Sequence, residues 1–154
     1  MRYRLFGRTG LRVSELFLGA MTFATDDARA LVDRYADAGG NVIDTATMYG
    51  DSELVVGKAL EGRRDRFVLA TKYTCTTDPT DVNAAGGHRK NLVRSLENSL
   101  RRLRTDHIDV YWVHVWDRHT PVEETLRALD DAVRAGKILY TGISDAPAWL
   151  ASHA

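Results

Sequence analysis

Four side chains in this sequence have the chemical types needed to act on a carbonyl group: Asp44, Tyr49, Lys72 and His114. A carboxylate, a phenol, an ammonium and an imidazole can together polarise a carbonyl oxygen and hand it a proton. The four residues span roughly 70 positions, and they lie at or just past the ends of strand-like segments. They would meet only if parallel strands deliver them to one rim, which is how barrel enzymes build their sites.

Each residue has a distinct expected role. A tyrosine in water releases its proton only near pH 10, so an unaided phenol is a reluctant donor. Lys72 would stabilise the phenolate form of Tyr49, and Asp44 would hold the lysine charged and oriented. His114 would donate a hydrogen bond to the substrate oxygen and stabilise the charge that develops as hydride reaches the carbon. Taken singly, each residue is more simply a surface, packing or core residue, and only their joint placement favours a shared site.

The elements that must position these residues alternate along the chain. Periodicity predicts strands at 15–19, 41–44, 67–71, 108–113 and 138–143, separated by helices at 28–36, 52–60, 88–102 and 120–135. A further helix is expected to begin at Pro147. Before the first of these strands, the turn-forming residues 7–10 predict a short N-terminal β-hairpin that caps one end.

The helix at 120–135 has the clearest start signal in the sequence. Thr120 is expected to be its N-cap and Pro121 its first helical residue, with Glu123 completing a capping box. Gly136 is expected to end it.

Mostly apolar strands separated by single helices predict an α/β fold with a parallel sheet. Val68 and Ala70 share a strand face with Lys72. A second set on the next strand shares its face with His114: Ile108, Val110 and Trp112. Apolar layers beneath a polar rim favour a TIM-barrel type over the alternative, a doubly wound open sheet, which is also weakened because residues 19–22 supply no G-x-G-x-x-G.

The composition of the chain limits the kinds of partner that it is expected to bind. Residues 1–154 fit a single domain, and 21 acidic against 21 basic residues give no field to attract nucleic acid or an anionic membrane. No apolar run reaches the ~18 residues of a membrane helix. Cys75 is the only cysteine, so a disulfide and a thiolate metal site are not expected, and a cytoplasmic location is the simplest interpretation. With no histidine beside it in the sequence, Cys75 is interpreted as a small loop residue.

Three segments carry a resemblance to a known family. Asp44-Thr45-Ala46-Thr47-Met48-Tyr49-Gly50, Ala70-Thr71-Lys72 and Asp109-Val110-Tyr111-Trp112-Val113-His114 resemble the signatures of the aldo-keto reductases. The segment at 7–14 is similar to the opening of bacterial members related to potassium-channel β subunits. The resemblance implies a (β/α) barrel that reduces an aldehyde or ketone to an alcohol with NADPH. It also implies that Tyr49 is the proton donor, that Lys72 and Asp44 tune it, and that His114 orients the carbonyl.

The resemblance extends to binding residues. It places the nicotinamide carboxamide near Ser144 and Asp145, at the end of the fifth strand, and Asp44, Met21 and Thr22 are the other candidates for cofactor contacts. Aromatic residues that lie just after strands are expected to line the substrate pocket: Phe23, Tyr73 and Trp116.

Family barrels have eight strands and about twice this length, whereas five β-α units are visible in this sequence. We therefore expect a truncated, incomplete barrel that lacks many of the residues that bind the cofactor in the family. Its open sheet edges predict self-association or a partly ordered monomer. The alternative to an enzyme is a noncatalytic half-barrel that acts as a binding or regulatory subunit.

Overall fold

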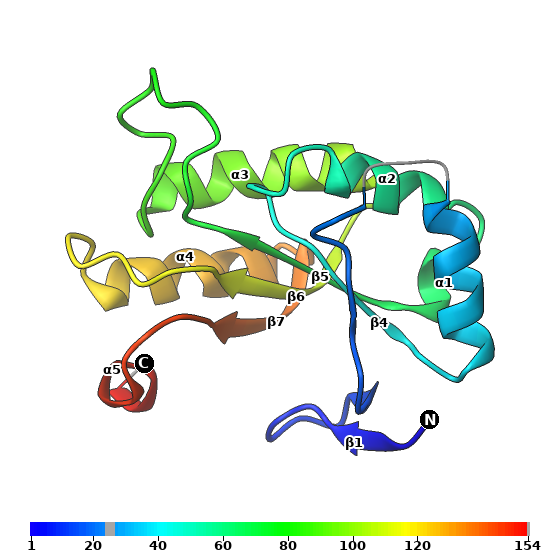
Figure 1. The fold of residues 1–154 in the computed structure, drawn as a ribbon. Helices are drawn as coiled ribbons and strands as arrows, with labels where there is room; N and C mark the ends of the chain where they lie inside the picture. Colours follow the sequence, from blue (N-terminus) through cyan, green and yellow to red (C-terminus); the bar gives the residue numbers. More distant parts are fainter. Residues whose placement is uncertain (24–26, 154) are drawn as a thin grey trace.

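The computed structural model describes residues 1–23 and 27–153, which form a parallel β-sheet with helices packed along one side (Figure 1). Within these residues the main sheet has the order β3-β4-β5-β6-β7, and every neighbouring pair is parallel. Its strands are β3 (Leu18–Gly19), β4 (Val42–Asp44), β5 (Val68–Tyr73), β6 (Ile108–Val113) and β7 (Ile138–Ile143). The helices are α1 (Ala28–Asp37), α2 (Ser52–Ala59), α3 (Arg89–Leu103), α4 (Val122–Arg134) and α5 (Ala148–His153), with a 3-10 turn at Arg64–Arg66. The predicted α/β class is confirmed.

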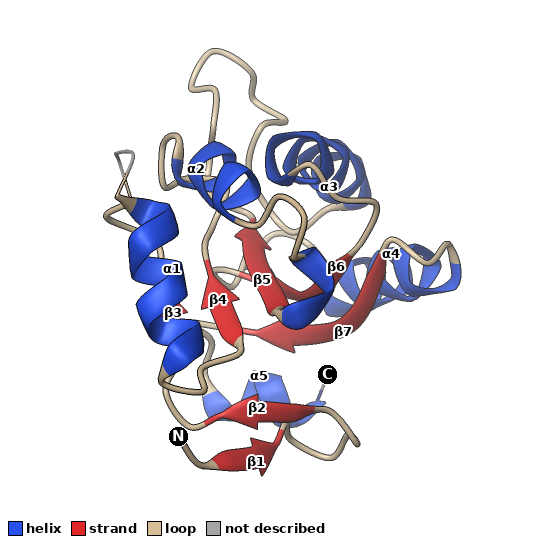
Figure 2. Cartoon of the chain, turned by 90° about the vertical axis from the view of Figure 1, so that its right-hand side faces the viewer, coloured by secondary structure: helices blue, strands red, loops and turns tan. Residues whose placement is uncertain are grey.

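The N-terminal hairpin predicted around residues 7–10 is also confirmed. β1 (Tyr3–Leu5) pairs antiparallel with β2 (Arg12–Ser14). Beyond β1, the Phe6 ring meets the Trp112 ring edge-on, with the two centroids 5.9 Å apart. The hairpin therefore lies on the side of the sheet that α1 to α4 leave uncovered (Figure 2).

The first strand of the main sheet is shorter than predicted. Residues 15–19 predict a strand over their whole length, but β3 contains only two residues. The carbonyl oxygen of Leu16 instead accepts hydrogen bonds from Ser14 Oγ at 2.8 Å and from the Tyr35 hydroxyl at 2.7 Å. Because side chains satisfy this backbone group, strand pairing begins only later in the segment.

The predicted capping box of α4 is wrong. The helix begins at Val122 with Pro121 as its N-cap residue, and no side chain caps it. Thr120 Oγ1 donates instead to Asp117 Oδ2 at 2.5 Å, and the same carboxylate oxygen accepts from the Gly87 backbone N–H at 2.9 Å. A nearby carboxylate thus competes successfully for the hydroxyl that the capping box would have used.

Alternate residues of each strand pack on opposite faces and form two separate cores. The helix-side core lies between the sheet and the helices and includes Ile43, Leu69, Tyr111 and Ile138 together with Leu92, Leu96 and Leu129. The inner core lies on the opposite face and contains Val13, Val42, Val68, Ala70 and Val110, against which Phe6, Leu11, Trp112 and Tyr140 pack. The period of two along a strand explains this separation.

The arrangement is that of a partial (β/α) barrel rather than a doubly wound sheet. In Figure 2 the helices α1 to α4 form an arc around one side of the strands, and the hairpin occupies the other side. A doubly wound sheet would carry helices on both faces. One residue departs from the predicted parity: Ile108, at the start of β6, packs with the helix-side core instead of the inner one.

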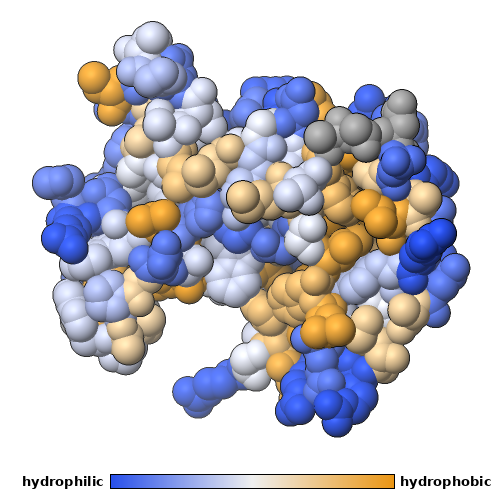
Figure 3. All heavy atoms as spheres, viewed as in Figure 1, coloured by the Kyte–Doolittle hydropathy of each residue, from blue (hydrophilic) through white to orange (hydrophobic). Residues whose placement is uncertain are grey.

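Several apolar side chains remain exposed near the hairpin. Figure 3 shows apolar residues gathered above the hairpin, along the segment between β2 and β3. Leu16 is 67% exposed and Phe17 is 42% exposed in this segment. Across residues 1–23 and 27–153, no helix is both long enough and apolar enough to cross a membrane.

Candidate active site

Three of the four predicted catalytic residues lie at the carboxyl ends of neighbouring strands. Asp44 is the last residue of β4, Lys72 is the penultimate residue of β5, and His114 directly follows β6. The strand register pairs Asp44 with Ala70 and Lys72 with Trp112. Since Ala70 and Trp112 belong to the inner core, all three functional side chains have the parity of the inner face.

Lys72 is held by two acceptors. Its ammonium forms an ion pair with Asp44 Oδ2 and donates a hydrogen bond to the carbonyl oxygen of Thr45 at 2.8 Å. Only 9% of Lys72 is exposed, and a buried ammonium without partners would be strongly destabilising. Asp44 and the Thr45 carbonyl oxygen therefore hold the Lys72 side chain at the rim.

Tyr49 joins the rim from the loop between β4 and α2. The Lys72 Nζ atom lies 5.1 Å from the centroid of the Tyr49 ring, and the Tyr49 and His114 rings pack edge-to-face with centroids 5.7 Å apart. The next residue, Gly50, has a φ of 57°, a left-handed conformation that glycine adopts without steric penalty. The structure thus brings phenol, ammonium and imidazole into one cluster.

The imidazole of His114 is biased toward its neutral form. Burial lowers the pKa of His114, and the positive charge of Lys72 lowers it further, whereas the negative charges of Asp44 and Asp145 act in the opposite direction. A neutral imidazole still carries one N–H, so His114 can donate a hydrogen bond to a carbonyl oxygen without bringing a second positive charge to the rim.

The predicted cofactor residues flank this cluster on two sides. Ser144 follows β7, and its backbone N–H donates to the Val113 carbonyl oxygen at 2.9 Å. Asp145 is exposed and has a φ of 47°. Its negative charge raises the pKa of His114, whereas burial lowers it. Met21 and Thr22 are exposed after β3. Accessible polar groups beyond the ends of the outermost strands are compatible with a cofactor that lies across the rim.

The predicted substrate-pocket residues separate into two groups. Trp116 is partly exposed, and its ring lies edge-on to Trp149 at 5.6 Å and under the Arg118 guanidinium at 5.4 Å. Tyr73 and Phe23 are both buried in the helix-side core, with 0% and 8% of the residue exposed. The structure therefore brings Trp116, but neither Tyr73 nor Phe23, to an accessible position near the rim.

Tyr73 is a structural residue. Its ring stacks on Tyr111 with centroids 5.2 Å apart, and its hydroxyl donates to the Gly87 carbonyl oxygen at 3.1 Å. Burial, assisted by the negative charges of Asp117 and Glu124, raises its pKa far above the ordinary value. The period-two rule that places Lys72 on the inner face predicts this burial, because Tyr73 is the next residue.

Sequence reasoning missed one neighbour of His114. Cys75 Sγ lies 3.7 Å from His114 Nδ1, although the two residues are far apart in the chain. Thr74, just before Cys75, has a φ of 92°, which is rare for a β-branched residue. No pattern in the sequence signals this contact, since it depends on how two neighbouring loops leave the sheet.

Sequence reasoning also missed the role of Glu53. This carboxylate is fully buried at the start of α2, where its Oε1 accepts from Thr71 Oγ1 at 2.8 Å and its Oε2 lies 3.2 Å from Arg102 Nε. Glu53 thus ties α2 to β5 and α3, and α2 directly follows the loop that carries Tyr49. The available signal was an acidic residue on the buried face of the predicted helix at 52–60.

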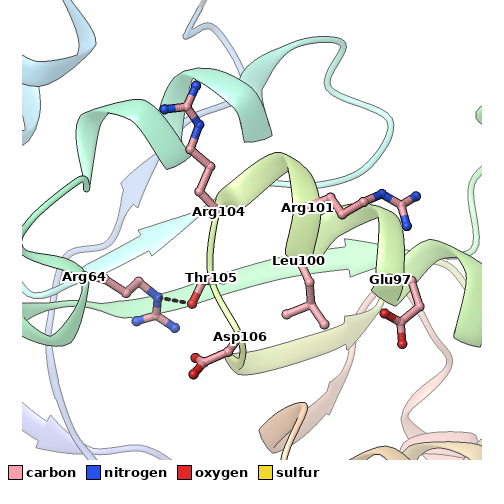
Figure 4. A pocket seen from close by; sticks show the side chains of 7 residues that line it. All are labelled: Arg64, Glu97, Leu100, Arg101, Arg104, Thr105 and Asp106. Atoms are coloured by element: carbon pink, nitrogen blue, oxygen red, sulfur yellow. Dashed lines mark hydrogen bonds between the residues drawn. The ribbon is translucent and has the colours of Figure 1, made fainter.

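A large surface hollow lies at the opposite end of the sheet and is not a rival site. It is lined by Arg64, Glu97, Leu100, Arg101, Arg104, Thr105 and Asp106 (Figure 4). Arg64 precedes β5. Its guanidinium forms an ion pair with Asp109 Oδ2 at 2.6 Å, and its Nε donates a hydrogen bond to Thr105 Oγ1 at 3.2 Å. Arg64 is therefore engaged in bonds that hold the amino end of β6.

No group of three or more histidine, cysteine or acidic side chains with metal-binding geometry occurs in the part of the chain that the structure describes. The rim itself offers a phenol beside an ammonium and an imidazole, and these groups can together donate a proton and a hydrogen bond to a carbonyl oxygen.

Comparison with known proteins finds similarity to the family that the sequence motifs resemble. The sequence profile of the Aldo/keto reductase family matches residues 15–154. The chain is 48% identical to the norsolorinic acid reductase stcV of Emericella nidulans over 92% of its length, and 43% identical to the norsolorinic acid reductase of Aspergillus flavus over 95%. It is 40% identical to the aryl-alcohol dehydrogenase [NADP(+)] of Phanerodontia chrysosporium over 94% of its length. The chain spans 42–44% of the length of these three relatives. The finer resemblance, to relatives of potassium-channel β subunits, stays a prediction.

Proposed function

This chain belongs to the aldo/keto reductase family, and from that membership we propose that it carries the catalytic rim of an oxidoreductase that reduces an aldehyde or ketone to an alcohol with NADPH. The observation that carries the proposal is the cluster at the rim. Lys72 Nζ lies 5.1 Å from the Tyr49 ring centroid, and the His114 ring lies 5.7 Å from the same ring.

In the proposed reaction the Tyr49 hydroxyl gives its proton to the carbonyl oxygen. Lys72 stabilises the phenolate that remains, and Asp44 and the Thr45 carbonyl oxygen hold the ammonium in place. The neutral imidazole of His114 donates a hydrogen bond to the same oxygen and stabilises the negative charge that develops there.

NADPH, when bound, supplies the hydride that adds to the carbonyl carbon. We propose that Ser144 and Asp145 contact the carboxamide of its nicotinamide, with Asp44, Met21 and Thr22 closing the opposite side. The backbone of Ser144 is bonded to β6 through the Val113 carbonyl oxygen, so Ser144 lies beside the strand that His114 follows. The choice of NADPH over NADH is supported by the relative from Phanerodontia chrysosporium, an aryl-alcohol dehydrogenase [NADP(+)].

The substrate is proposed to be a small carbonyl compound that packs against Trp116. This residue offers a partly exposed indole two positions after His114. An aromatic aldehyde is the natural first probe, because a flat ring can stack on an indole.

The test combines binding and turnover on the full chain. Titration with NADPH, followed by fluorescence, should show saturable binding, and an aromatic aldehyde should be reduced with loss of the NADPH absorbance. The Tyr49→Phe variant should bind NADPH equally well but reduce the aldehyde far more slowly. The Tyr140→Phe variant is the matched control, because it loses the same atom from an inner-face residue of β7. Absence of saturable NADPH binding would reject the enzymatic function for this chain.

A second candidate function is favoured by the open edge of the sheet. Within the described residues β7 has a strand on one side only, and Leu139 in β7 is 45% exposed. A hollow of about 350 Å³ runs between β7 and the hairpin, lined by Phe6, Gly7, Arg8, Thr9, Val133, Leu139, Tyr140 and Thr141. We also propose that this edge pairs with a second copy of the chain. Pairing alone does not exclude catalysis, and a noncatalytic chain that acts as a binding or regulatory subunit is the alternative to the reductase.

Sedimentation velocity tests the second candidate. Self-association that depends on concentration is expected, and Leu139→Lys should shift the chain toward the monomer because a lysine disfavours edge-to-edge pairing. Val82→Lys is the matched control, since Val82 is 93% exposed and lies outside the sheet. A chain that stays monomeric at all concentrations would reject this candidate.

A further inference from the structure

The contact between Cys75 and His114 involves Nδ1 of the imidazole and leaves Nε2 as the second nitrogen of the ring. Cys75 Sγ lies 3.7 Å from Nδ1 of His114, within the reach of a hydrogen bond to sulfur. An imidazole has two nitrogens, and the partner of one decides which of them carries the proton. The contact therefore bears on whether the other nitrogen, Nε2, can donate to a carbonyl oxygen.

The backbone delivers Cys75 to this position at some energetic cost. Thr74 has a φ of 92°, a conformation that is strained for a β-branched residue. Two hydrogen bonds hold it there: Thr74 Oγ1 accepts from the Val115 N–H at 3.0 Å, and the Thr74 carbonyl oxygen accepts from the Gly86 N–H at 2.8 Å. Val115 is the residue after His114, so the chain that carries the imidazole also fixes the loop that carries the thiol.

The charge states leave a single proton to be placed on the imidazole. Burial raises the pKa of the Cys75 thiol, and Asp145 raises it further, although a hydrogen bond with Thr74 acts in the opposite direction. Burial and Lys72 lower the pKa of His114. Thiol and imidazole are thus both neutral near pH 7, with Tyr49, Lys72, Asp44 and Asp145 as the titratable groups around them.

We propose that Cys75 is a positioning residue whose S–H donates to Nδ1 of His114 and thereby holds the imidazole proton on Nε2, the nitrogen that donates to the carbonyl oxygen. The inference rests on the proposed reductase function for its consequence, but the tautomer itself is a property of the free chain. A serine at this position would keep the donor, whereas an alanine would remove it.

The first test measures the tautomer directly. In ¹⁵N-labelled full chain, long-range proton–nitrogen correlations distinguish Nδ1–H from Nε2–H, and His114→Gln identifies the His114 signals. The wild type and Cys75→Ser should show the proton on Nε2. In Cys75→Ala the tautomer ratio should move toward that of the exposed His119 in the same spectrum. A wild-type signal with the proton on Nδ1, or a ratio that Cys75→Ala leaves unchanged, would overturn the proposal.

The second test measures the consequence for turnover. Cys75→Ala should lower kcat for aldehyde reduction about three- to tenfold, the range expected for one weak hydrogen bond, and Cys75→Ser should restore most of it. KM for NADPH should not change. Loss of the Nε2 tautomer without a change in kcat would overturn the positioning role. A chain that shows the Cys75-dependent tautomer but never reduces a carbonyl would contradict the proposed function and leave the tautomer assignment standing.

Discussion

The two faces of the sheet are built from the same strands but differ in what covers them. On the helix side, buried residues of β4 to β7 pack against residues of α1 to α4 such as Leu92 and Leu129. On the inner side, the buried set is small, and the hairpin is its main cover. The polar residues Lys72 and His114 stand at the rim of this thinly covered face. Buried packing is therefore concentrated on one face and the candidate reactive side chains on the other.

Neighbouring residues of one strand show how sharp the division is. Leu69 and Tyr73 belong to the helix-side core, whereas Ala70 lies in the inner core and Lys72 reaches the rim. Because successive side chains of a strand point to opposite faces, a substitution at one residue should affect stability while its neighbour affects function.

The largest expected effect is on turnover. Tyr49→Phe should lower kcat for aldehyde reduction by about 10²- to 10⁴-fold, because it removes the proposed proton donor. The free energy of unfolding should change little, since the ring remains in place. Tyr73→Phe is the counterpart on the other face: it loses the hydrogen bond to the Gly87 carbonyl oxygen, which should reduce stability by about 1 kcal/mol and leave kcat near the wild-type value. Steady-state kinetics and urea unfolding of both variants check this, and a Tyr73→Phe variant that loses turnover without losing stability would break the division.

The next effect compares the two cores. Leu92→Ala should lower the free energy of unfolding by about 2–5 kcal/mol, because Leu92 is fully buried on the helix side and its removal leaves a cavity. Val68→Ala on the inner face should lower it by about 1–2 kcal/mol, since fewer buried carbons are lost and 7% of Val68 is already exposed. Chemical denaturation measures both values, and equal losses would contradict the ranking.

A third variant tests how tightly the inner face is packed. A Cβ added at Gly142 would lie 2.2 Å from the Trp112 ring, whereas one added at Gly19 meets nothing within 4 Å. Gly142→Ala should therefore destabilise the chain by about 1–3 kcal/mol through overpacking, and Gly19→Ala should have little effect. Thermal unfolding provides the measurement. If Gly142→Ala were tolerated as well as Gly19→Ala, Trp112 would be free to move and the inner face would be looser than described.

The smallest effect is on pH dependence. The pKa of His114 is lower in the folded chain than the ordinary value of about 6.5. As pH falls below that ordinary value, the unfolded chain binds the proton first, so His114 should weaken the folded state until the pH passes below its folded pKa. His114→Gln should flatten the stability profile in that window. Urea unfolding between about pH 7 and pH 5 measures it, and a profile that His114→Gln leaves unaltered would refute the lowered pKa.

The Lys72→Met variant tests the electrostatic part of the His114 pKa shift. Loss of the ammonium should raise the His114 pKa, because a nearby positive charge is removed, but it should not restore the ordinary value, since burial is the larger cause. A titration of the His114 ring by NMR checks the shift. A downward movement would show that Lys72 does not act on the imidazole as described.

Much of the fold followed from patterns along the chain. The predicted strand at 108–113 coincides with β6 and that at 138–143 with β7, because each is a mostly apolar run. The errors arose where side chains outside the predicted pattern formed hydrogen bonds. Asp117 took the hydroxyl of Thr120 from the predicted capping box, and the Tyr35 and Ser14 side chains bonded the Leu16 carbonyl oxygen within the predicted first strand.

The candidate site was predicted in part for the same reason. The parity of Lys72 and His114 within their strands is a local property, so their common face was predictable. The burial of Tyr73 was equally predictable but was overlooked. The approach of Cys75 to His114 was not, because the φ of Thr74 depends on hydrogen bonds from Val115 and Gly86 in other segments.

The order of strands and helices, the face that most strand residues occupy and the set of candidate reactive side chains were determined by the sequence itself, because periodicity and residue type act over a few neighbouring residues. Only the tertiary structure decided which of those side chains touch, how the Tyr49 ring lies against Lys72 and His114, and that a thiol completes their surroundings. Such contacts depend on how separate loops leave the sheet, and their geometry is set by hydrogen bonds between residues that are distant in the chain.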